Sequence, residues 1–94
     1  MQRITDKDLN ATVARINQIM GANPEPYTKD SDGKYRANIG TYHISGAYGG
    51  KALFKMISEG GGVNDVFGYG HITKRELYER MQAFIRGLEV KLMA

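Results

Sequence analysis

Cysteine is missing from this chain of 94 residues, and the only histidines are His43 and His71. Without cysteine the chain can form no disulfide and no thiolate metal site, and cysteine nucleophile chemistry is excluded. The two histidines lie far apart in the sequence, and no carboxylate stands at a spacing typical of metal ligands. The sequence therefore predicts neither a metal site nor a bound cofactor.

Long apolar runs are missing as well. No run approaches the roughly 18 residues that a membrane-spanning helix needs, and residues 1–6 lack the apolar core of a signal peptide. We therefore expect a protein that stays in the cytoplasm where it is made and has no membrane partner. Apolar residues form 41% of the chain and charged residues 24%, which suits a single folded domain over residues 1–94.

A large excess of charge of one sign is also missing. The 13 basic and 10 acidic residues are mostly interspersed and leave a net charge of +3. This charge attracts phosphate-bearing partners weakly at long range, but it is too small to indicate nucleic-acid binding. The basic residues near the end of the chain alternate with Glu76, Glu79 and Glu89, which is typical of a solvated helix face. Nucleic acid is therefore the least favoured partner.

Glycine, by contrast, is abundant in the middle of the chain. Nine of the 12 glycines lie between Gly40 and Gly70, interleaved with tyrosines, histidines and basic residues. Glycine permits positive φ and lets a ligand or a second backbone approach closely. Exposed aromatic and basic side chains beside such backbone are typical of a binding surface. The glycine-rich middle therefore predicts loops that bind a partner.

Two helices are predicted from their start signals. Thr5 is a good N-cap for a helix over 6–20, Asp8 completes a capping box, and Gly21 is a good C-cap. The same form recurs at Thr73 with Glu76, and the apolar spacing that follows predicts a long amphipathic helix to about residue 92.

The segment between these helices predicts short strands and one short helix. Strands over 27–29 and 34–36 flank an Asp-Gly turn, and a third strand over 41–45 would complete an antiparallel meander. Residues 51–59 cluster apolar side chains at helical spacing and predict a central helix of two to three turns. Residues 63–67 predict a short final strand. The expected fold class is α+β.

The two glycine loops predict a site for an anionic ligand. Gly46–Lys51 and Gly68–His71 each precede an expected helix, whose N-terminus offers free amide groups and the positive end of a dipole. Tyrosines and His43 would stack or hydrogen-bond, while Lys51, His71, Lys74 and Arg75 would hold phosphate. The candidate ligand-binding residues are Tyr42, His43, Tyr48, Gly49, Gly50, Lys51, Tyr69, Gly70, His71, Thr73, Lys74 and Arg75.

No catalytic residue is predicted. His43 and His71 are candidate general bases and Ser45 and Ser58 candidate nucleophiles, but sequence spacing places no base, orienting group and nucleophile together. The chain is therefore expected not to be an enzyme. Protein binding stays open beside ligand binding, because Tyr48 and Tyr69 combine aromatic rings with flexible backbone. The broad apolar stripe of the last helix also leaves a homo-oligomer open.

Two strings, YHISGAYGG over 42–50 and GHITKRELY over 70–78, resemble a family of small accessory proteins of tailed bacteriophages and prophages. The resemblance covers nearly the whole chain and implies a protein that acts in the cytoplasm of a host bacterium. Some proteins of this kind sequester nucleotide immune signals, and others block host proteins directly. The expected function is non-enzymatic sequestration of a phosphate-bearing small molecule, such as a cyclic nucleotide or an ADP-ribose-like signal. The alternative is an inhibitor that binds a host protein through the same loops.

Overall fold

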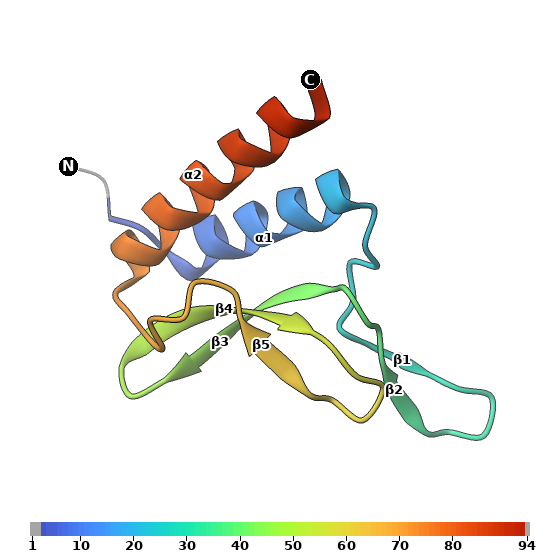
Figure 1. The fold of residues 1–94 in the computed structure, drawn as a ribbon. Coiled ribbons are helices and arrows are strands. Elements are labelled where there is room, and N and C mark those ends of the chain that lie inside the picture. The colour runs from blue at the N-terminus through green and yellow to red at the C-terminus, as the bar shows by residue number, and fades with distance from the viewer. Residues whose placement is uncertain (1–2, 94) are drawn as a thin grey trace.

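Two helices pack on one face of a three-stranded antiparallel sheet, and a separate two-stranded hairpin projects from one end (Figure 1). The computed structural model describes residues 3–93, with side chains through residue 91. The elements follow the order α1 (Asp6–Met20), β1 (Tyr27–Lys29), β2 (Tyr35–Ala37), β3 (Tyr42–Ala47), β4 (Gly50–Met56), β5 (Val63–Asp65) and α2 (Lys74–Met93). The fold class is therefore α+β, as predicted. Within residues 3–93, neither helix has the length and apolar character needed to cross a membrane.

The first helix begins and ends where its capping residues predict. The Asp8 backbone N–H donates to Thr5 Oγ1 at 3.2 Å, and the Thr5 N–H donates to Asp8 Oδ2 at 2.8 Å. Gly21 ends the helix in the left-handed region with a φ of 67°. At the start of α2, Thr73 Oγ1 accepts a hydrogen bond from the Glu76 N–H at 3.1 Å. Both starts are set by local side-chain chemistry.

The predicted central helix over 51–59 is wrong, because this segment is strand β4. It lies in the middle of the sheet, pairing with β3 on one side and with β5 on the other. Ala52, Leu53 and Met56 are each at most 1% exposed, so both faces of the strand are buried. A short apolar run that is buried on both faces cannot be distinguished from a helix by periodicity alone. Pairing with two neighbouring strands, which is a tertiary effect, decides the conformation.

The predicted meander of three strands is also corrected. β1 and β2 form the expected hairpin but make a sheet of their own, and β3 pairs with β4. Gly40, with a φ of 95°, turns the chain out of this hairpin, and its N–H donates to the Met56 carbonyl at 2.8 Å. The chain therefore starts the second sheet at β3. The predicted final strand is present as β5.

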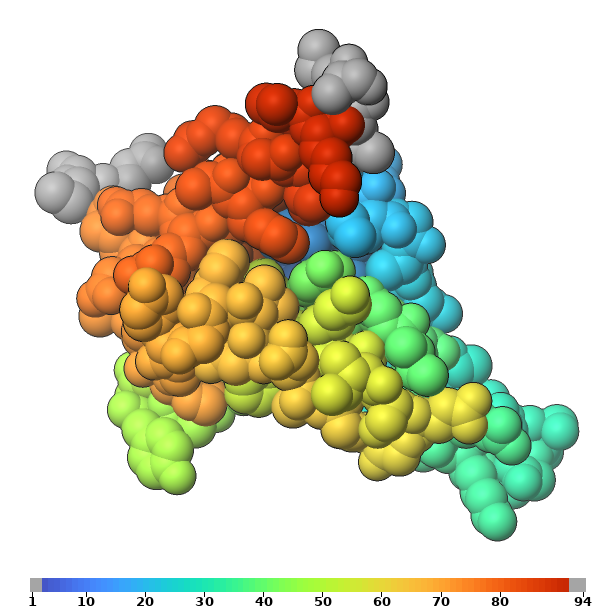
Figure 2. Space-filling view, in the orientation of Figure 1, coloured from blue at the N-terminus to red at the C-terminus, as the bar shows by residue number. Residues whose placement is uncertain are grey.

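The core lies between the helices and the sheet face that they cover. Its fully buried members come from α1, α2 and the middle of the sheet, and they are Leu9, Ile16, Tyr42, Leu53, Leu77, Met81 and Ile85. The two helices begin at the same end of the sheet and run in the same general direction (Figure 1). Figure 2 shows the β1–β2 hairpin and the β3–β4 turn projecting at opposite ends of the molecule.

Asn17 fixes α1 to the beginning of β3. Its side chain is only 2% exposed, its Nδ2 donates to the Tyr42 carbonyl at 2.9 Å, and its Oδ1 accepts from the Tyr42 N–H at 2.8 Å. The side-chain amide thus serves both backbone groups of Tyr42, as a neighbouring strand would. This contact positions the sheet edge that leads into the glycine loops.

Candidate functional site

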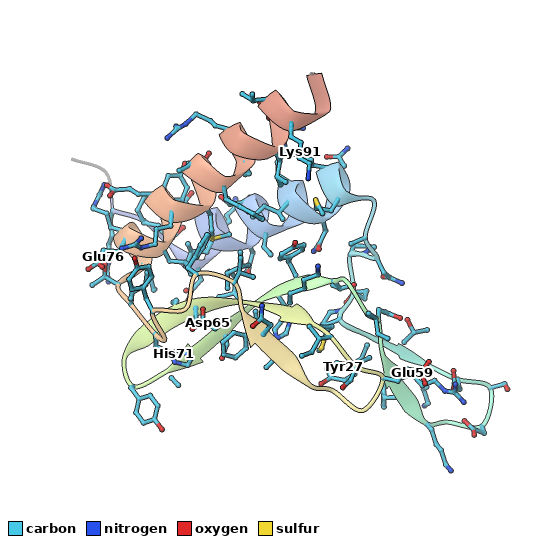
Figure 3. All side chains as sticks on the ribbon, viewed as in Figure 1. Tyr27, Glu59, Asp65, His71, Glu76 and Lys91 are labelled. Carbon is cyan, nitrogen blue, oxygen red and sulfur yellow. The ribbon has the colours of Figure 1, made fainter. Side chains whose placement is uncertain are left out.

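The structure separates the predicted site residues into several places. Lys51 and Lys74 converge at the start of the two helices, while His43, Tyr48 and His71 gather on the sheet face away from the helices. The remaining predicted side chains have other environments, described below. Figure 3 shows His71 and Asp65 at the same end of the sheet.

Four rings form a continuous aromatic layer on the outer face of the sheet, consisting of His43, Tyr48, Phe54 and His71. The ring of Phe54 lies between both histidines, with centroid distances of 5.8 Å to His43 and 5.9 Å to His71. The ring of Tyr48 extends the layer, 6.1 Å from His71. All three contacts are edge-to-face, an arrangement that aromatic pairs favour. The aromatic layer brings together both histidines of the chain.

Phe54 is a member of this layer that the sequence analysis missed. It was assigned to the apolar side of the predicted helix, whereas on a strand it points away from its neighbour Leu53. Because directly paired residues share a face, Phe54 lies on the same side as His43, its partner in β3. Reading residues 51–56 with the two-residue period of a strand would have identified it.

A polar pair borders the aromatic layer. Ser45 Oγ and His71 Nε2 lie 3.2 Å apart, although spacing alone could not bring these residues together. The loop that carries His71 is held by Asp65, whose carboxylate accepts the N–H groups of Gly68 at 3.1 Å and Gly70 at 2.8 Å. A hydroxyl and an imidazole can each donate and accept hydrogen bonds, and in this structure the two groups bind each other.

Tyr48 stands at the tip of the β3–β4 hairpin. Its φ of 53° and the φ of 75° at Gly49 are both positive, as in a two-residue type I′ turn. Asn or Gly is the usual first residue of this turn, and a bulky residue in the left-handed region is strained. The Tyr48 side chain is nevertheless fully exposed. A strained and wholly exposed aromatic residue is a good candidate for a contact residue.

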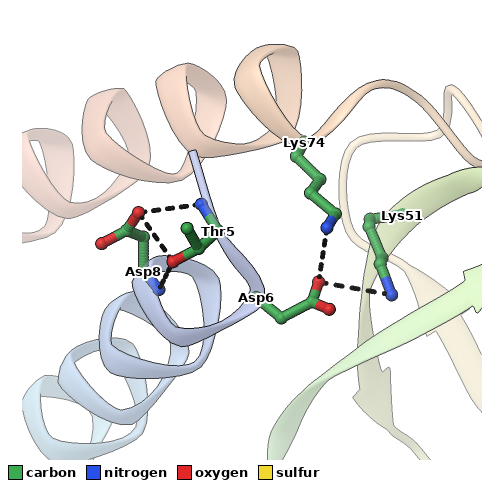
Figure 4. A network of polar contacts seen from close by, with 5 residues as sticks. All are labelled: Thr5, Asp6, Asp8, Lys51 and Lys74. Carbon is green, nitrogen blue, oxygen red and sulfur yellow. Dashed lines mark hydrogen bonds and ion pairs between the residues drawn. The ribbon is translucent and has the colours of Figure 1, made fainter. Parts of the chain in front are cut away.

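Two lysines predicted from separate loops meet at one carboxylate. Lys74 Nζ lies 3.3 Å and Lys51 Nζ 3.5 Å from Asp6 Oδ1, as Figure 4 shows. The hydrogen bond from Lys74 is the main cause that lowers the pKa of Asp6, and the charge of Lys51 adds to it. Lys51 reaches Asp6 across Gly46, where a Cβ atom would stand 2.9 Å from Lys51 Nζ. Asp6 was not among the predicted site residues.

Other predicted residues have different surroundings. The side chain of Tyr42 is buried in the core, where its ring lies 6.0 Å from the ring of Phe84. Tyr69 stacks on the guanidinium of Arg80, 4.1 Å from its ring centroid. Thr73 serves as a helix cap, and Arg75 lies in the first turn of α2. None of these four belongs to the aromatic layer.

A groove lies elsewhere, between the exposed sides of the two helices. It has a volume of about 390 Å³ and is lined by Asp8, Ala11, Thr12, Arg15, Tyr78, Gln82, Ile85 and Glu89. None of the predicted site residues lines it. Its polar groups bind one another, since Arg15 pairs with Glu89 at 3.1 Å and Gln82 donates to Thr12 at 3.3 Å. The groove therefore offers few unpaired polar groups to a ligand.

In the described part of the chain, no three histidine or acidic side chains gather to hold a metal ion.

His43 is expected to make the stability of the protein depend on pH. Burial lowers the pKa of His43 below the ordinary histidine value of 6.5. Below that pH the unfolded chain therefore binds more protons than the folded protein, and the free energy of unfolding falls as the pH decreases. We expect the melting temperature to decrease as the pH is lowered from about 7.5 to about 5.5.

The variant His43→Leu checks this assignment. It removes the titrating group from the aromatic layer but keeps an apolar side chain, so the melting temperature should depend less on pH in the same range. Asp6 and Asp8 do not interfere, because their pKa values lie below the ordinary value of 3.8. An identical pH slope in wild type and variant would show that His43 is not responsible.

Comparison of this chain with protein-family models, curated proteins and solved structures gave no match.

Proposed function

We propose that this protein is a non-enzymatic binding protein that captures a phosphate-bearing nucleotide-type molecule, with the base on the aromatic layer. The carrying observation is that the rings of His43, Phe54, His71 and Tyr48 form one layer on the sheet face away from the helices. A planar base stacks on such rings, and each stacked base contributes about 1–3 kcal/mol in nucleic-acid-binding proteins. Ser45 and His71, which lie 3.2 Å apart beside the rings, would exchange this contact for hydrogen bonds to the edge of the base.

The electrostatics support an anionic ligand. Lys51 and Lys74 lie at the same end of the sheet as the β3–β4 turn, and Lys51 is the second residue of β4 after that turn. Both helices begin beside the lysines, so the positive ends of their dipoles add to the local potential. The net charge of +3 favours the approach of a phosphate-bearing molecule.

The biological setting that we propose follows from the resemblance of residues 42–50 and 70–78 to accessory proteins of tailed bacteriophages. In the cytoplasm of an infected bacterium, a protein that binds a cyclic nucleotide or an ADP-ribose-like signal without converting it lowers the free concentration of that signal. Sequestration needs affinity and abundance but no catalytic machinery. It is therefore compatible with a site made of rings and cations on an open surface.

Binding of nucleotides is tested by native mass spectrometry with a panel of nucleotides, cyclic nucleotides and ADP-ribose. We expect a stoichiometric adduct with at least one member of the panel. Tyr48→Asn and Phe54→Leu should each weaken it about tenfold or more, because each removes a stacking surface. Asparagine suits the positive φ of residue 48, and leucine keeps residue 54 apolar.

Tyr35→Asn is the matched control, because Tyr35 is an exposed tyrosine on the distant β1–β2 hairpin. It should leave the affinity unchanged. If the wild type binds a ligand and both Tyr48→Asn and Phe54→Leu bind it equally well, the ligand does not bind at the aromatic layer. Wild-type protein that binds no member of the panel would refute capture of nucleotides.

Inhibition of a host protein is the second candidate. The observation that favours it is the complete exposure of Tyr48 at the tip of the β3–β4 hairpin, since tyrosine is a frequent anchor at protein interfaces. In that case one defined host protein would be retained by the wild type and lost with Tyr48→Asn, while the nucleotide panel gives no adduct. Measurement of both readouts on the same variants separates the two candidates.

A further inference from the structure

Asp6 lies where two cations converge, and within residues 3–91 its carboxylate is the only acidic group that pairs with Lys51 or Lys74. Both ammonium groups approach the same atom, Asp6 Oδ1. One negative charge thus faces two positive charges, which gives this cluster of three side chains an excess of one positive charge. A terminal phosphate, which carries about −1.5 to −2 charges near neutral pH, would match the lysine pair better than a carboxylate does.

We propose that Asp6 occupies the position of an anionic group of the ligand, and that a phosphate or diphosphate displaces it when the ligand binds. This inference rests on the proposed function for the base-bearing part of the ligand. The inference adds the lysine pair as a second contact region of the ligand, and it makes Asp6 an internal competitor for these lysines. In the free protein, the Asp6 side chain therefore occupies the phosphate subsite.

The Asp6 contacts are weak enough to be replaced. The side chain of Asp6 is 60% exposed, and those of Lys51 and Lys74 are 27% and 38% exposed. Ion pairs at such positions contribute little to stability, because water screens them and the side chains lose entropy. The start of α1 does not depend on Asp6 either, since Thr5 and Asp8 supply its capping box. The carboxylate can therefore turn away without loss of the helix cap.

Gly46 makes room for the side chain of Lys51. Lys51 extends over Gly46 to reach Asp6, and a Cβ atom at residue 46 would come within 2.9 Å of Lys51 Nζ. Because Gly46 and Lys51 are paired and share a face, the side chain of Lys51 lies directly over Gly46. Glycine at this position therefore allows Lys51 to reach Asp6.

The two contact regions lie on opposite faces of the sheet, which restricts the ligand. Lys51 shares the helix-covered face with Leu53, whereas Phe54 and the rest of the aromatic layer lie on the other face. A ligand that stacks its base on Phe54 reaches the lysines only around the end or edge of β3 and β4. The geometry favours an extended ligand with several bonds between base and terminal phosphate or second sugar, such as a dinucleotide or an ADP-ribose-like molecule, over a mononucleotide.

The competition is tested with inorganic pyrophosphate as the probe, in chemical-shift titrations at low ionic strength. We expect Asp6→Asn to bind pyrophosphate about threefold to tenfold more tightly than the wild type, because the internal competitor is removed. Lys51→Gln in the Asp6→Asn background should abolish the gain. Asp32→Asn is the charge-matched control, since it changes the net charge equally in the β1–β2 turn, and it should have little effect.

An equal gain with Asp32→Asn would show that net charge alone is responsible, and would overturn the proposal. A gain that survives Lys51→Gln, or no gain with Asp6→Asn, would overturn it too. ADP-ribose as a second probe tests the proposed function separately. Phe54→Leu should weaken binding of ADP-ribose and leave that of pyrophosphate unchanged. If neither probe responds to Phe54→Leu while Asp6→Asn strengthens pyrophosphate binding, the phosphate subsite stands and the base site fails.

Discussion

Asn17→Ala is expected to lower the free energy of unfolding by about 2–6 kcal/mol, since two buried backbone groups are left unpaired at about 1–3 kcal/mol each. Both groups belong to Tyr42, the first residue of β3. Alanine can neither donate to the Tyr42 carbonyl nor accept its N–H, and water has little access because Asn17 is almost fully buried. Denaturant unfolding monitored by circular dichroism measures the change.

Asn10→Ala provides the control for this prediction. Asn10 lies on the exposed side of the same helix, so its replacement should change the free energy of unfolding by no more than about 0.5 kcal/mol. Comparable losses in the two variants would indicate that asparagine in α1 matters for the helix itself. The contact with β3 would then contribute little.

Gly50→Ala is expected to destabilise the protein by about 1–3 kcal/mol and to disturb the candidate site, because the added methyl group meets backbone. A Cβ atom at residue 50 would stand 2.9 Å from the His71 carbonyl carbon and 2.9 Å from the Ile72 oxygen. These atoms belong to the stretch that pairs with Lys51, through hydrogen bonds of 2.7 and 2.8 Å. Backbone atoms cannot turn aside as a flexible side chain can.

The effect of Gly50→Ala on the candidate site is measured by the NMR resonances of the His71 imidazole. Its resonances should shift as the 3.2 Å contact with Ser45 lengthens, and ligand affinity should fall together with stability. Gly60→Ala is the matched variant, since a Cβ atom there meets nothing within 4 Å. Gly60→Ala should keep both the stability and the His71 resonances. An unperturbed His71 in Gly50→Ala would mean that residues 71–72 adapt without affecting the site.

Features set by neighbouring residues could be predicted from the sequence. The ends of α1 follow from Thr5, Asp8 and Gly21, and the β1–β2 hairpin follows from an Asp-Gly turn. Such signals act over a few residues, so they need no knowledge of the rest of the chain. The start of α2 at Thr73 belongs to the same class.

Features set by distant residues could not be predicted. Strand β4 is formed by partners on both sides, and its seven residues alone are also compatible with a short helix. A loop over Gly46–Lys51 was predicted, but its form as a two-residue turn at Tyr48 and Gly49 depends on the pairing of β3 with β4. Lysines 51 and 74 were identified as cations, but their meeting at Asp6 depends on how α1 and α2 pack. The aromatic layer likewise depends on the register between β3 and β4.

The packing of α1 against α2 also constrains when this protein can fold during its synthesis. Arg15 and Glu89, which pair across the two helices, are separated by 74 residues. Leu9 and Ile16 of α1 share their core with Leu77 and Met81, which the ribosome adds only after all five strands. Contacts of such high sequence separation form late, because the intervening chain must close first. The part of the apolar side of α1 that packs against α2 therefore stays uncovered on the nascent chain until α2 has emerged.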